Sequence, residues 1–252
     1  MSVKISVITV AYNACDVLEQ TILSVIGQNY DNLEYIVIDG GSTDGSVDII
    51  KKYDDKITYW VSEPDKGIYD AMNKGVAVST GEWVNFMNAG DVFYNKSVLS
   101  EIYFEKYNNF DVLYGAVLFK SKFMDDIVSP APLNTMITRI PFNHQAVFSK
   151  CIITKFNTEY KLCADYDLFY GLYVNNYKFK ELKNTVAIFD GEGVSCSNLL
   201  DVYRESYLIQ KKYNRKNARL IYWYKVFKTR VLNVIERIAP NKCVQFLYKV
   251  KG

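Results

Sequence analysis

The chain has 252 residues, of which 49% are hydrophobic and 23% are charged, so it can bury the core of one large domain with an appendage. Its five cysteines are an odd number without Cys-x-x-Cys spacing, which argues against a disulfide framework or a zinc site and favours a reducing cytosol. The first 200 residues hold 17 basic against 25 acidic residues, and this acidic balance argues against nucleic acid as a ligand.

The first hundred residues alternate between strands and helices. An apolar, β-branched run from Ile5 to Tyr12, too short for a membrane span, predicts a buried strand, and apolar residues at helical spacing follow from Val17 to Val25. The run from Leu33 to Asp39 predicts a second strand that ends in an acidic turn. The alternation continues with helices expected at Ser46–Tyr53 and Ile68–Val78 and strands expected at Ile57–Val61 and Glu82–Asn88.

This order of elements predicts an α/β fold with a mostly parallel central sheet flanked by helices. We expect one domain over residues 1–200 and a helical extension over residues 201–252. Ligands of such a sheet bind at the carboxyl ends of its strands.

Three acidic turns with glycines follow the predicted strands, and they contain Asp39, Asp65 and Asp91. Their oxygens suit hydroxyl groups, the edge of a nucleobase or a hard divalent cation. Taken singly, such aspartates are also common as turn formers and helix caps. The chain has no Gly-x-x-x-x-Gly-Lys-Ser/Thr loop, and Gly40 to Gly45 does not match Gly-x-Gly-x-x-Gly, so neither an ATPase nor a dinucleotide dehydrogenase is supported.

Several segments closely resemble the family 2 glycosyltransferases of bacterial polysaccharide clusters: residues 6–13, 37–45, 63–75, 86–91, 143–148 and 163–168. The resemblance implies a GT-A, Rossmann-like domain and an inverting hexosyl- or N-acetylhexosaminyltransferase. Its expected donor is a nucleotide diphosphate sugar, with uridine as the favoured base. Its expected acceptor is a saccharide, free or linked to a lipid carrier, in the assembly of capsule, O-antigen or exopolysaccharide.

The resemblance also implies roles for individual residues. The turn after the first strand would hold the nucleotide, Asp39 would contact the nucleobase, and Asp65 would continue the same pocket. Asp91 would bind a Mn²⁺ or Mg²⁺ ion that bridges the donor diphosphate. The full set expected to contact donor or acceptor is Thr9, Ala11, Tyr12, Asn13, Asp39, Asp65, Lys66, Asn73, Asn88 and His144.

Two departures from the family pattern affect the expected chemistry. Asn88 and Gly90 stand where many members have further aspartates, so Asp91 is a single carboxylate and modest metal affinity is expected. Ala164 replaces an acidic residue beside the expected general base, Asp165, and Asp167 is the alternative base. His144, the only histidine, could contact donor or acceptor or be a structural hydrogen-bond donor.

Two rival functions are weighed against this one. A sugar-nucleotide pyrophosphorylase would need a glycine-rich, basic signature at the first strand, and Ala11 to Cys15 does not supply it. A non-catalytic scaffold that binds sugar nucleotides within an assembly complex stays open because the metal motif has lost carboxylates.

Residues 201–252 hold 13 basic against 3 acidic residues, a balance of +10. Basic residues flank an apolar stripe here, and Pro240 follows it, which predicts a basic amphipathic helix. The helix is expected either to pack on protein, including a second copy of the chain, or to lie on the anionic inner leaflet of the membrane. Its stripe consists of Leu220, Trp223, Tyr224, Phe227, Val231, Val234, Ile235 and Ile238, flanked by Lys225, Lys228, Arg230 and Arg237.

Overall fold

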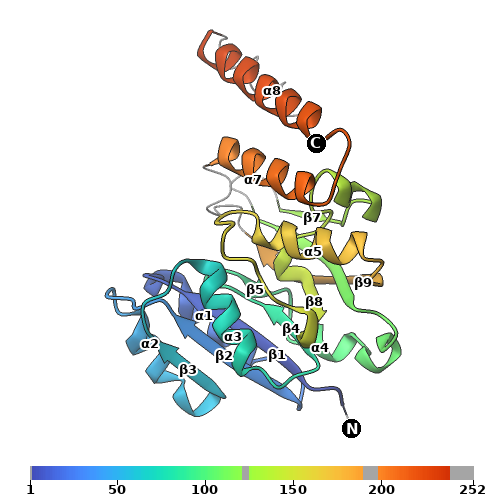
Figure 1. The fold of residues 1–252 in the computed structure, drawn as a ribbon. Coiled ribbons are helices and arrows are strands. Elements are labelled where there is room, and N and C mark those ends of the chain that lie inside the picture. Colours follow the sequence, from blue (N-terminus) through green and yellow to red (C-terminus); the bar gives the residue numbers. More distant parts are fainter. Residues whose placement is uncertain (1, 121–124, 190–197, 239–252) are drawn as a thin grey trace. The chain divides into compact units, whose positions relative to one another are not determined.

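The computed structural model describes residues 2–120, 125–189 and 198–238, with side chains as far as Val231. The chain forms two compact units, Met1–Gly193 and Val194–Gly252, and each is described by itself (Figure 1). The domain boundary expected after residue 200 stays a prediction.

The first unit begins with an alternation of strands and helices that builds four parallel strands. These elements are β1 (Ile5–Ala11), α1 (Cys15–Ile26), β2 (Leu33–Asp39), α2 (Ser46–Lys52), β3 (Tyr59–Ser62), α3 (Ile68–Val78) and β4 (Trp83–Phe86). The strands lie in the order β3-β2-β1-β4. In register, Ala11 pairs with Asp39 and Asp39 with Ser62, so the carboxyl ends of β1, β2 and β3 meet at one edge.

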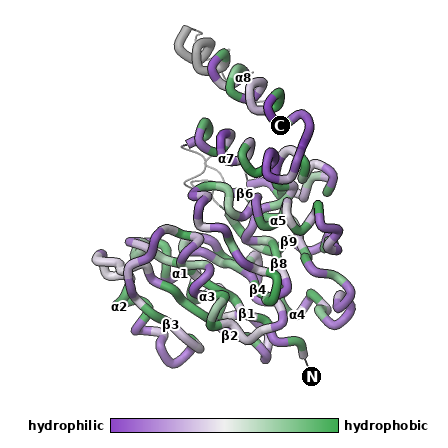
Figure 2. Tube along the Cα trace, in the orientation of Figure 1, coloured by the Kyte–Doolittle hydropathy of each residue, from purple (hydrophilic) through white to green (hydrophobic). Residues whose placement is uncertain are grey.

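Both faces of these strands are covered, which explains why β1 is buried along its whole length. Ile5 and Val7 pack in one hydrophobic cluster with Leu18 and Ile22 of α1. On the other face, Ile8 and Val10 pack with Ala71 and Met72 of α3. The central strands are accordingly drawn as largely hydrophobic segments in Figure 2.

The second half of the unit adds a mixed set of strands. Its elements are β5 (Val92–Phe93), α4 (Val98–Glu101), β6 (Val112–Phe119), β7 (Asp126–Val128), β8 (Val147–Lys150), α5 (Ala164–Val174) and β9 (Phe179–Phe189). Strand β8 runs antiparallel to both β4 and β6, whereas β9 is parallel to β6 and antiparallel to β5. Over the described residues, the sheet order is β3-β2-β1-β4-β8-β6-β9-β5, with β7 beside β6.

The expected α/β fold class is confirmed, and the expected helix Ile68–Val78 and strand Leu33–Asp39 have the observed bounds. The strand expected to reach Asn88 ends at Phe86, which frees the following residues to form a turn. The pairing is parallel throughout β3-β2-β1-β4, and antiparallel pairing begins at β8, which runs antiparallel to both β4 and β6.

The second unit contains α7 (Leu199–Lys212) and α8 (Ala218–Ile238), so the expected C-terminal helix is present. The two helices contact each other through Tyr207 and Tyr222, whose ring centres lie 5.3 Å apart. The expected stripe residues Val234, Ile235 and Ile238 have side chains outside the described set, as does Pro240. Neither of these helices, nor any other among the described residues, has the length and apolar character needed to cross a membrane.

Candidate active site

The turns after β1 and β2 are tied to each other by hydrogen bonds. Asn13 takes a left-handed backbone conformation with φ of 46°, which asparagine tolerates better than most residues. Its backbone N–H donates to Ser42 Oγ at 2.8 Å, and its Oδ1 accepts from the Thr43 N–H at 2.9 Å. The two turns therefore form one rigid edge, beside which the Tyr12 ring is 66% exposed.

The other two residues expected in the nucleotide-binding turn are buried. Thr9 Oγ1 donates to the Met87 carbonyl at 2.7 Å and lies 3.0 Å from the Tyr35 hydroxyl, so its side chain belongs to the core. Ala11 is also buried, and its carbonyl accepts from the Gly40 N–H at 2.9 Å. Of the four expected residues, Tyr12 and Asn13 are the ones exposed at this edge.

Asp39 is fully buried at the end of β2 and is held by its own turn. Its Oδ2 accepts from the backbone N–H groups of Gly41 and Ser42 at 3.1 and 2.9 Å and from the Ser62 hydroxyl at 2.6 Å. The turn-forming role and the expected base-binding role thus fall on the same carboxylate, which these donors fix in one orientation.

Asp65 approaches the same edge from the segment before α3. A methyl group on Gly40 would lie 2.4 Å from Asp65 Oδ2 and 3.2 Å from the Tyr12 ring, so a side chain there would displace the Asp65 carboxylate. Asp65 Oδ1 accepts from the Gly67 N–H at 2.8 Å, which fixes the carboxylate at the start of α3. The structure thus brings together Tyr12, Asp65 and the Asp39 turn.

Lys66 lies in the turn before α3, and Asn73 lies on α3 itself. The Lys66 N–H donates to the Asp70 carboxylate at 3.0 Å, and the Lys66 side chain is exposed. Both polar atoms of the Asn73 amide bond the backbone of Phe156, each at 2.9 Å. Asn73 therefore joins α3 to the segment that leads into α5.

The Asp91 turn leaves the sheet beside β1 and is anchored on α1. Gly90 has φ of 100°, a conformation that other residues rarely adopt. Thr21 Oγ1 accepts from the Gly90 N–H at 3.0 Å and donates to the Asp91 carbonyl at 2.8 Å. Asp91 is 9% exposed, and its Oδ1 accepts from Gln145 Nε2 at 3.0 Å. The Thr21 hydroxyl thus holds the backbone of the Asp91 turn against α1.

Asn88 contacts His144, at the start of the 3-10 turn His144–Ala146. The Asn88 Nδ2 lies 3.0 Å from His144 Nε2. Because an amide nitrogen only donates, Nε2 accepts and the ring proton is on Nδ1. Burial lowers the pKa of His144 to about 4, which keeps the ring neutral at neutral pH.

The amide oxygens of Asn88 and Gln145 are candidate ligands of the cation expected at Asp91. A carboxylate accepts hydrogen bonds, which fixes the orientation of the Gln145 amide and leaves Gln145 Oε1 on its far side. Gln145 Oε1 and Asn88 Oδ1 are both buried and have no hydrogen-bond partner among the described residues. Carboxylate and amide oxygens are the hard-oxygen ligands that Mg²⁺ and Mn²⁺ prefer, so the chemistry of these side chains fits the expected cation. Within the same residues, no group of three or more His, Cys, Asp or Glu side chains could hold a metal by itself.

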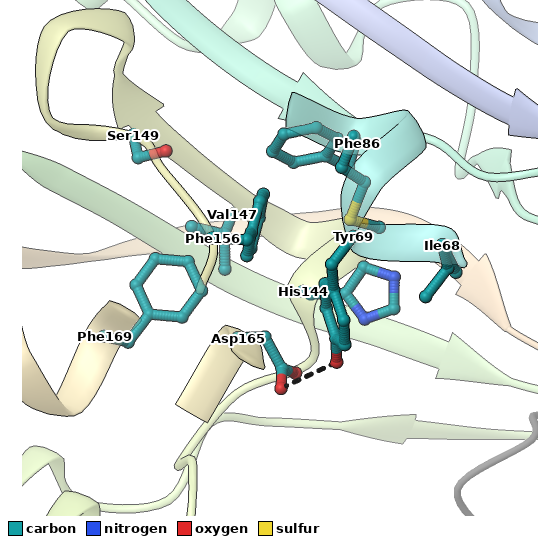
Figure 3. A pocket seen from close by; sticks show the side chains of 10 residues that line it. Ile68, Tyr69, Phe86, His144, Val147, Ser149, Phe156, Asp165 and Phe169 are labelled. Carbon is teal, nitrogen blue, oxygen red and sulfur yellow. Dashed lines mark hydrogen bonds between the residues drawn. The ribbon is translucent and has the colours of Figure 1, made fainter. Parts of the chain in front are cut away.

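Asp165 lies in the first turn of α5 and lines a pocket of about 40 Å³ (Figure 3). Its Oδ1 accepts from the Tyr69 hydroxyl at 3.2 Å and from the Tyr166 N–H at 2.8 Å. Burial and the adjacent Asp165 raise the pKa of Tyr69, so its hydroxyl stays protonated and donates. The pocket is lined by Ile68, Tyr69, Met72, Phe86, His144, Val147, Ser149, Phe156, Asp165 and Phe169.

His144 connects the two parts of the site, since it contacts Asn88 of the Asp91 turn and lines the pocket with Asp165. Asp167, the alternative base, is buried in α5 and is not among the residues that line this pocket. Sequence reasoning assigned no role to Gln145 or Tyr69. Both lie in segments that resemble the family, Tyr69 in residues 63–75 and Gln145 in residues 143–148. Their position in these segments is the sequence feature that could have pointed to them.

Comparison with known proteins gives sequence relatives over part of the chain. It is 42% identical over 98 residues to an uncharacterized glycosyltransferase of Mycobacterium tuberculosis, across 38% of this chain and 37% of that protein. It is 29% identical over 171 residues to a PGL/p-HBAD biosynthesis glycosyltransferase of Mycobacterium bovis, across 64% and 66% of the two. The chain therefore spans between 37% and 66% of the length of these curated relatives.

Solved structures with the same fold include Staphylococcus aureus TarS 1–349 in complex with UDP. Its TM-score is 0.64 at 21% identity, over 82% of this chain and 65% of that one. The mannosyltransferase PcManGT of Pyrobaculum calidifontis, in complex with GDP-Man and Mn²⁺, has a TM-score of 0.68 at 14% identity, over 100% and 80% of the two chains. These likenesses confirm the GT-A type of α/β fold.

The family model described as Glycosyl transferase family 2 matches residues 6–167. This range includes every acidic turn of the site, the His144–Gln145 turn and Asp165. Because the match covers well over half of the 252 residues, the chain belongs to glycosyl transferase family 2.

Proposed function

We propose that the protein is an inverting glycosyltransferase that moves a hexosyl or N-acetylhexosaminyl group from a nucleotide diphosphate sugar, with UDP favoured, to a saccharide acceptor. The observation that carries this proposal is the gathering of acidic turns and the Asp165 pocket in one site. Asp39 and Asp65 meet at the sheet edge, and His144 links the Asp91 turn to Asp165.

The donor side of the proposal rests on the parallel half of the sheet. The exposed Tyr12 ring offers a flat apolar surface for a nucleobase, beside the carboxylates of Asp39 and Asp65, which accept from base or ribose donors. Complexes of proteins with this fold support the same ligand class, since TarS was solved with UDP and PcManGT with GDP-Man.

Asp91 would hold a divalent cation, and Gln145 donates to its carboxylate. When bound, Mn²⁺ or Mg²⁺ would neutralise the negative charge that develops on the departing diphosphate. The protein's own part is to fix Asp91, which Gln145 Nε2 does at the carboxylate and Thr21 does at the backbone.

Asp165 is the proposed general base. As the acceptor hydroxyl attacks the anomeric carbon, a new C–O bond forms, the bond to the diphosphate breaks, and the hydroxyl proton passes to the Asp165 carboxylate. The Tyr69 hydroxyl holds that carboxylate from one side. A single displacement of this kind inverts the anomeric centre and needs no nucleophile from the protein.

We further propose that the acceptor is a saccharide on a lipid carrier, in the assembly of bacterial surface polysaccharide, and that the protein works at the cytoplasmic face of the inner membrane. The basic balance of residues 201–252 supports a position near anionic lipid. A relative named for PGL/p-HBAD biosynthesis supports a place in the assembly of glycosylated products.

A thermal-shift screen of common nucleotide sugars with and without Mn²⁺ tests the donor assignment, because a ligand that binds the folded state raises the melting temperature. We expect the largest shift with a UDP-sugar and Mn²⁺, and we expect Asp91→Ala to abolish both the metal-dependent part of that shift and transfer. Near-normal turnover of Asp91→Ala would contradict the metal mechanism.

The alternative is a non-catalytic scaffold that binds sugar nucleotides, and the observation that favours it is the single carboxylate of the Asp91 turn. It predicts tight metal-dependent nucleotide binding without donor hydrolysis or transfer on any acceptor. Release of UDP in the presence of acceptor would exclude it.

A further inference from the structure

Helix α8 has one face that packs on α7. Val226 and Ala218 are 5% and 4% exposed on this face. Tyr222 stacks near Tyr207, and Thr229 Oγ1 donates to the hydroxyl of a tyrosine on α7 at 3.4 Å. At about 100° per residue, these four positions of α8 fall on one side of the helix.

The opposite face of α8 is apolar and exposed. Its side chains lie within an arc of about 100° and are between 38% and 74% exposed. The face includes a tryptophan and a tyrosine, which combine an apolar ring with a polar group and so favour the boundary between hydrocarbon and water. We call it the outer face: Leu220, Trp223, Tyr224, Phe227 and Val231.

Basic residues border the outer face along both of its sides. Arg219 and Arg230 lie along one edge and Lys228 along the other, and all three are exposed. Long basic side chains at such edges extend their charged ends toward the polar layer while their methylene stems cover apolar surface. The alternation of apolar and polar segments along α8 can be followed in Figure 2.

We propose that the outer face of α8 docks on an anionic lipid bilayer. Its apolar side chains would enter the boundary between headgroups and acyl chains, and Arg219, Lys228 and Arg230 would meet the lipid phosphates. The charge argument favours lipid over pairing of α8 with α8 of a second copy, because that pairing would bring together regions that each carry a balance of +10. The docking surface itself does not depend on the proposed function. Only the purpose of docking rests on it, and that purpose is access to a lipid-linked acceptor.

The test is sedimentation of the full chain with vesicles of phosphatidylcholine, with and without phosphatidylglycerol. We expect binding to the anionic vesicles, weakened by high salt. Exchange of Arg219 and Arg230 for Gln should lower the affinity about fivefold for each charge removed. The double variant Trp223→Ser/Phe227→Ser should lose binding.

Ile152→Ser is the matched control, since Ile152 is 94% exposed in the other unit and lies outside the site. It removes a similar apolar side chain from water and should bind vesicles as the wild type does. Equal binding of the Trp223/Phe227 variant and the wild type would overturn the proposal. The proposal would also be overturned if the wild type does not bind anionic vesicles and instead forms a dimer that the Trp223/Phe227 variant dissociates.

The same variants separate this inference from the proposed function. The Trp223/Phe227 variant should still transfer sugar to a water-soluble acceptor, because its substitutions lie outside the catalytic unit. A wild type that binds vesicles but transfers no sugar would refute the proposed function and leave the docking surface standing.

Discussion

At the scale of single residues, the two aspartates of α5 are expected to behave differently. Asp165 lines the pocket and accepts from Tyr69, whereas Asp167 is buried in the helix. Asp165→Asn removes the proposed proton acceptor and should lower kcat by a factor of about 10² to 10⁴, with UDP affinity little changed. Steady-state kinetics and UDP titration measure both quantities.

Asp167→Asn is the companion variant. Because it perturbs a buried side chain, it should lower the melting temperature and leave kcat of the folded protein close to wild type. A larger loss of kcat in Asp167→Asn than in Asp165→Asn would reassign the base to Asp167.

Gln145 is expected to act through Asp91. Partners that orient a metal ligand typically contribute a factor of 10 to 100 in metal affinity, and Gln145 Nε2 would be such a partner if Asp91 binds the proposed cation. Gln145→Met keeps the length of the side chain but loses the donor, so it should weaken Mn²⁺ binding by about 10-fold or more. Titration with Mn²⁺ followed by electron paramagnetic resonance measures this directly.

Thr154→Val supplies the control for Gln145→Met. Thr154 is equally buried and loses hydrogen bonds to Ser149 and Lys150 when changed, but neither of these belongs to the Asp91 turn. Mn²⁺ affinity should be unchanged in it. Equal weakening in both variants would mean that Gln145 contributes only to general stability.

At the scale of elements, Asn73 ties α3 to the chain that leads into α5. Resemblance to the family suggested a ligand contact for it, but its amide makes two hydrogen bonds to the Phe156 backbone. Asn73→Ala should therefore cost about 2 kcal/mol of unfolding free energy by leaving buried backbone groups unpaired. Urea unfolding measures this, and an unchanged midpoint with weaker donor binding would restore the ligand role.

Strand β2 is pinned at its start by Glu34. Burial alone would raise the pKa of Glu34, but hydrogen bonds from Lys4, Ser6 and Thr80 outweigh it and bring the pKa to about 2. A pKa lowered in the folded state contributes stability that is present above the unfolded value of 4.5 and is lost as the pH falls toward 2.

The stability difference between wild type and Glu34→Gln should follow the same window. It should be largest at neutral pH, shrink below about pH 4.5 and nearly vanish at about pH 2. Melting temperatures of both proteins across this range provide the measurement. A difference that does not depend on pH would show that the ionised carboxylate is not the stabilising form.

At the scale of the whole molecule, the first half of the fold was predictable and the second was less so. Strands β1 and β2 are rich in β-branched apolar residues and α3 has apolar residues at helical spacing, so local pattern located them. The antiparallel return of β8 depends on pairing with β4 and β6, which are distant in sequence, and no local pattern encodes it.

The candidate site, like the fold, was predictable from the sequence only in part. Aspartates at strand ends were visible in the sequence, because strand order alone places them at one edge. The contacts of Gln145 with Asp91 and of Tyr69 with Asp165 span 54 and 96 residues, so they follow from tertiary packing and were not predictable.

The uneven charge of the chain leads to a prediction for the intact protein. Deletion of residues 216–252 removes most of the basic residues of the C-terminal region and the whole outer face. In cell fractionation, the truncated protein should move from the membrane fraction to the soluble fraction. Unchanged partitioning would place the membrane contact elsewhere in the chain.

The line between β4 and β8, where parallel pairing gives way to antiparallel pairing, also separates two contributions to the site. Tyr12, Asp39, Asp65 and Asp91 are all supplied before the chain crosses it, and His144 and Asp165 after it. The two portions are joined by the contacts of Gln145 with Asp91, of Tyr69 with Asp165 and of Asn73 with Phe156, so an exchange of one portion has to keep these partners. A chimera that keeps residues 1–91 and takes its remainder from a relative should retain its donor preference and acquire a new acceptor.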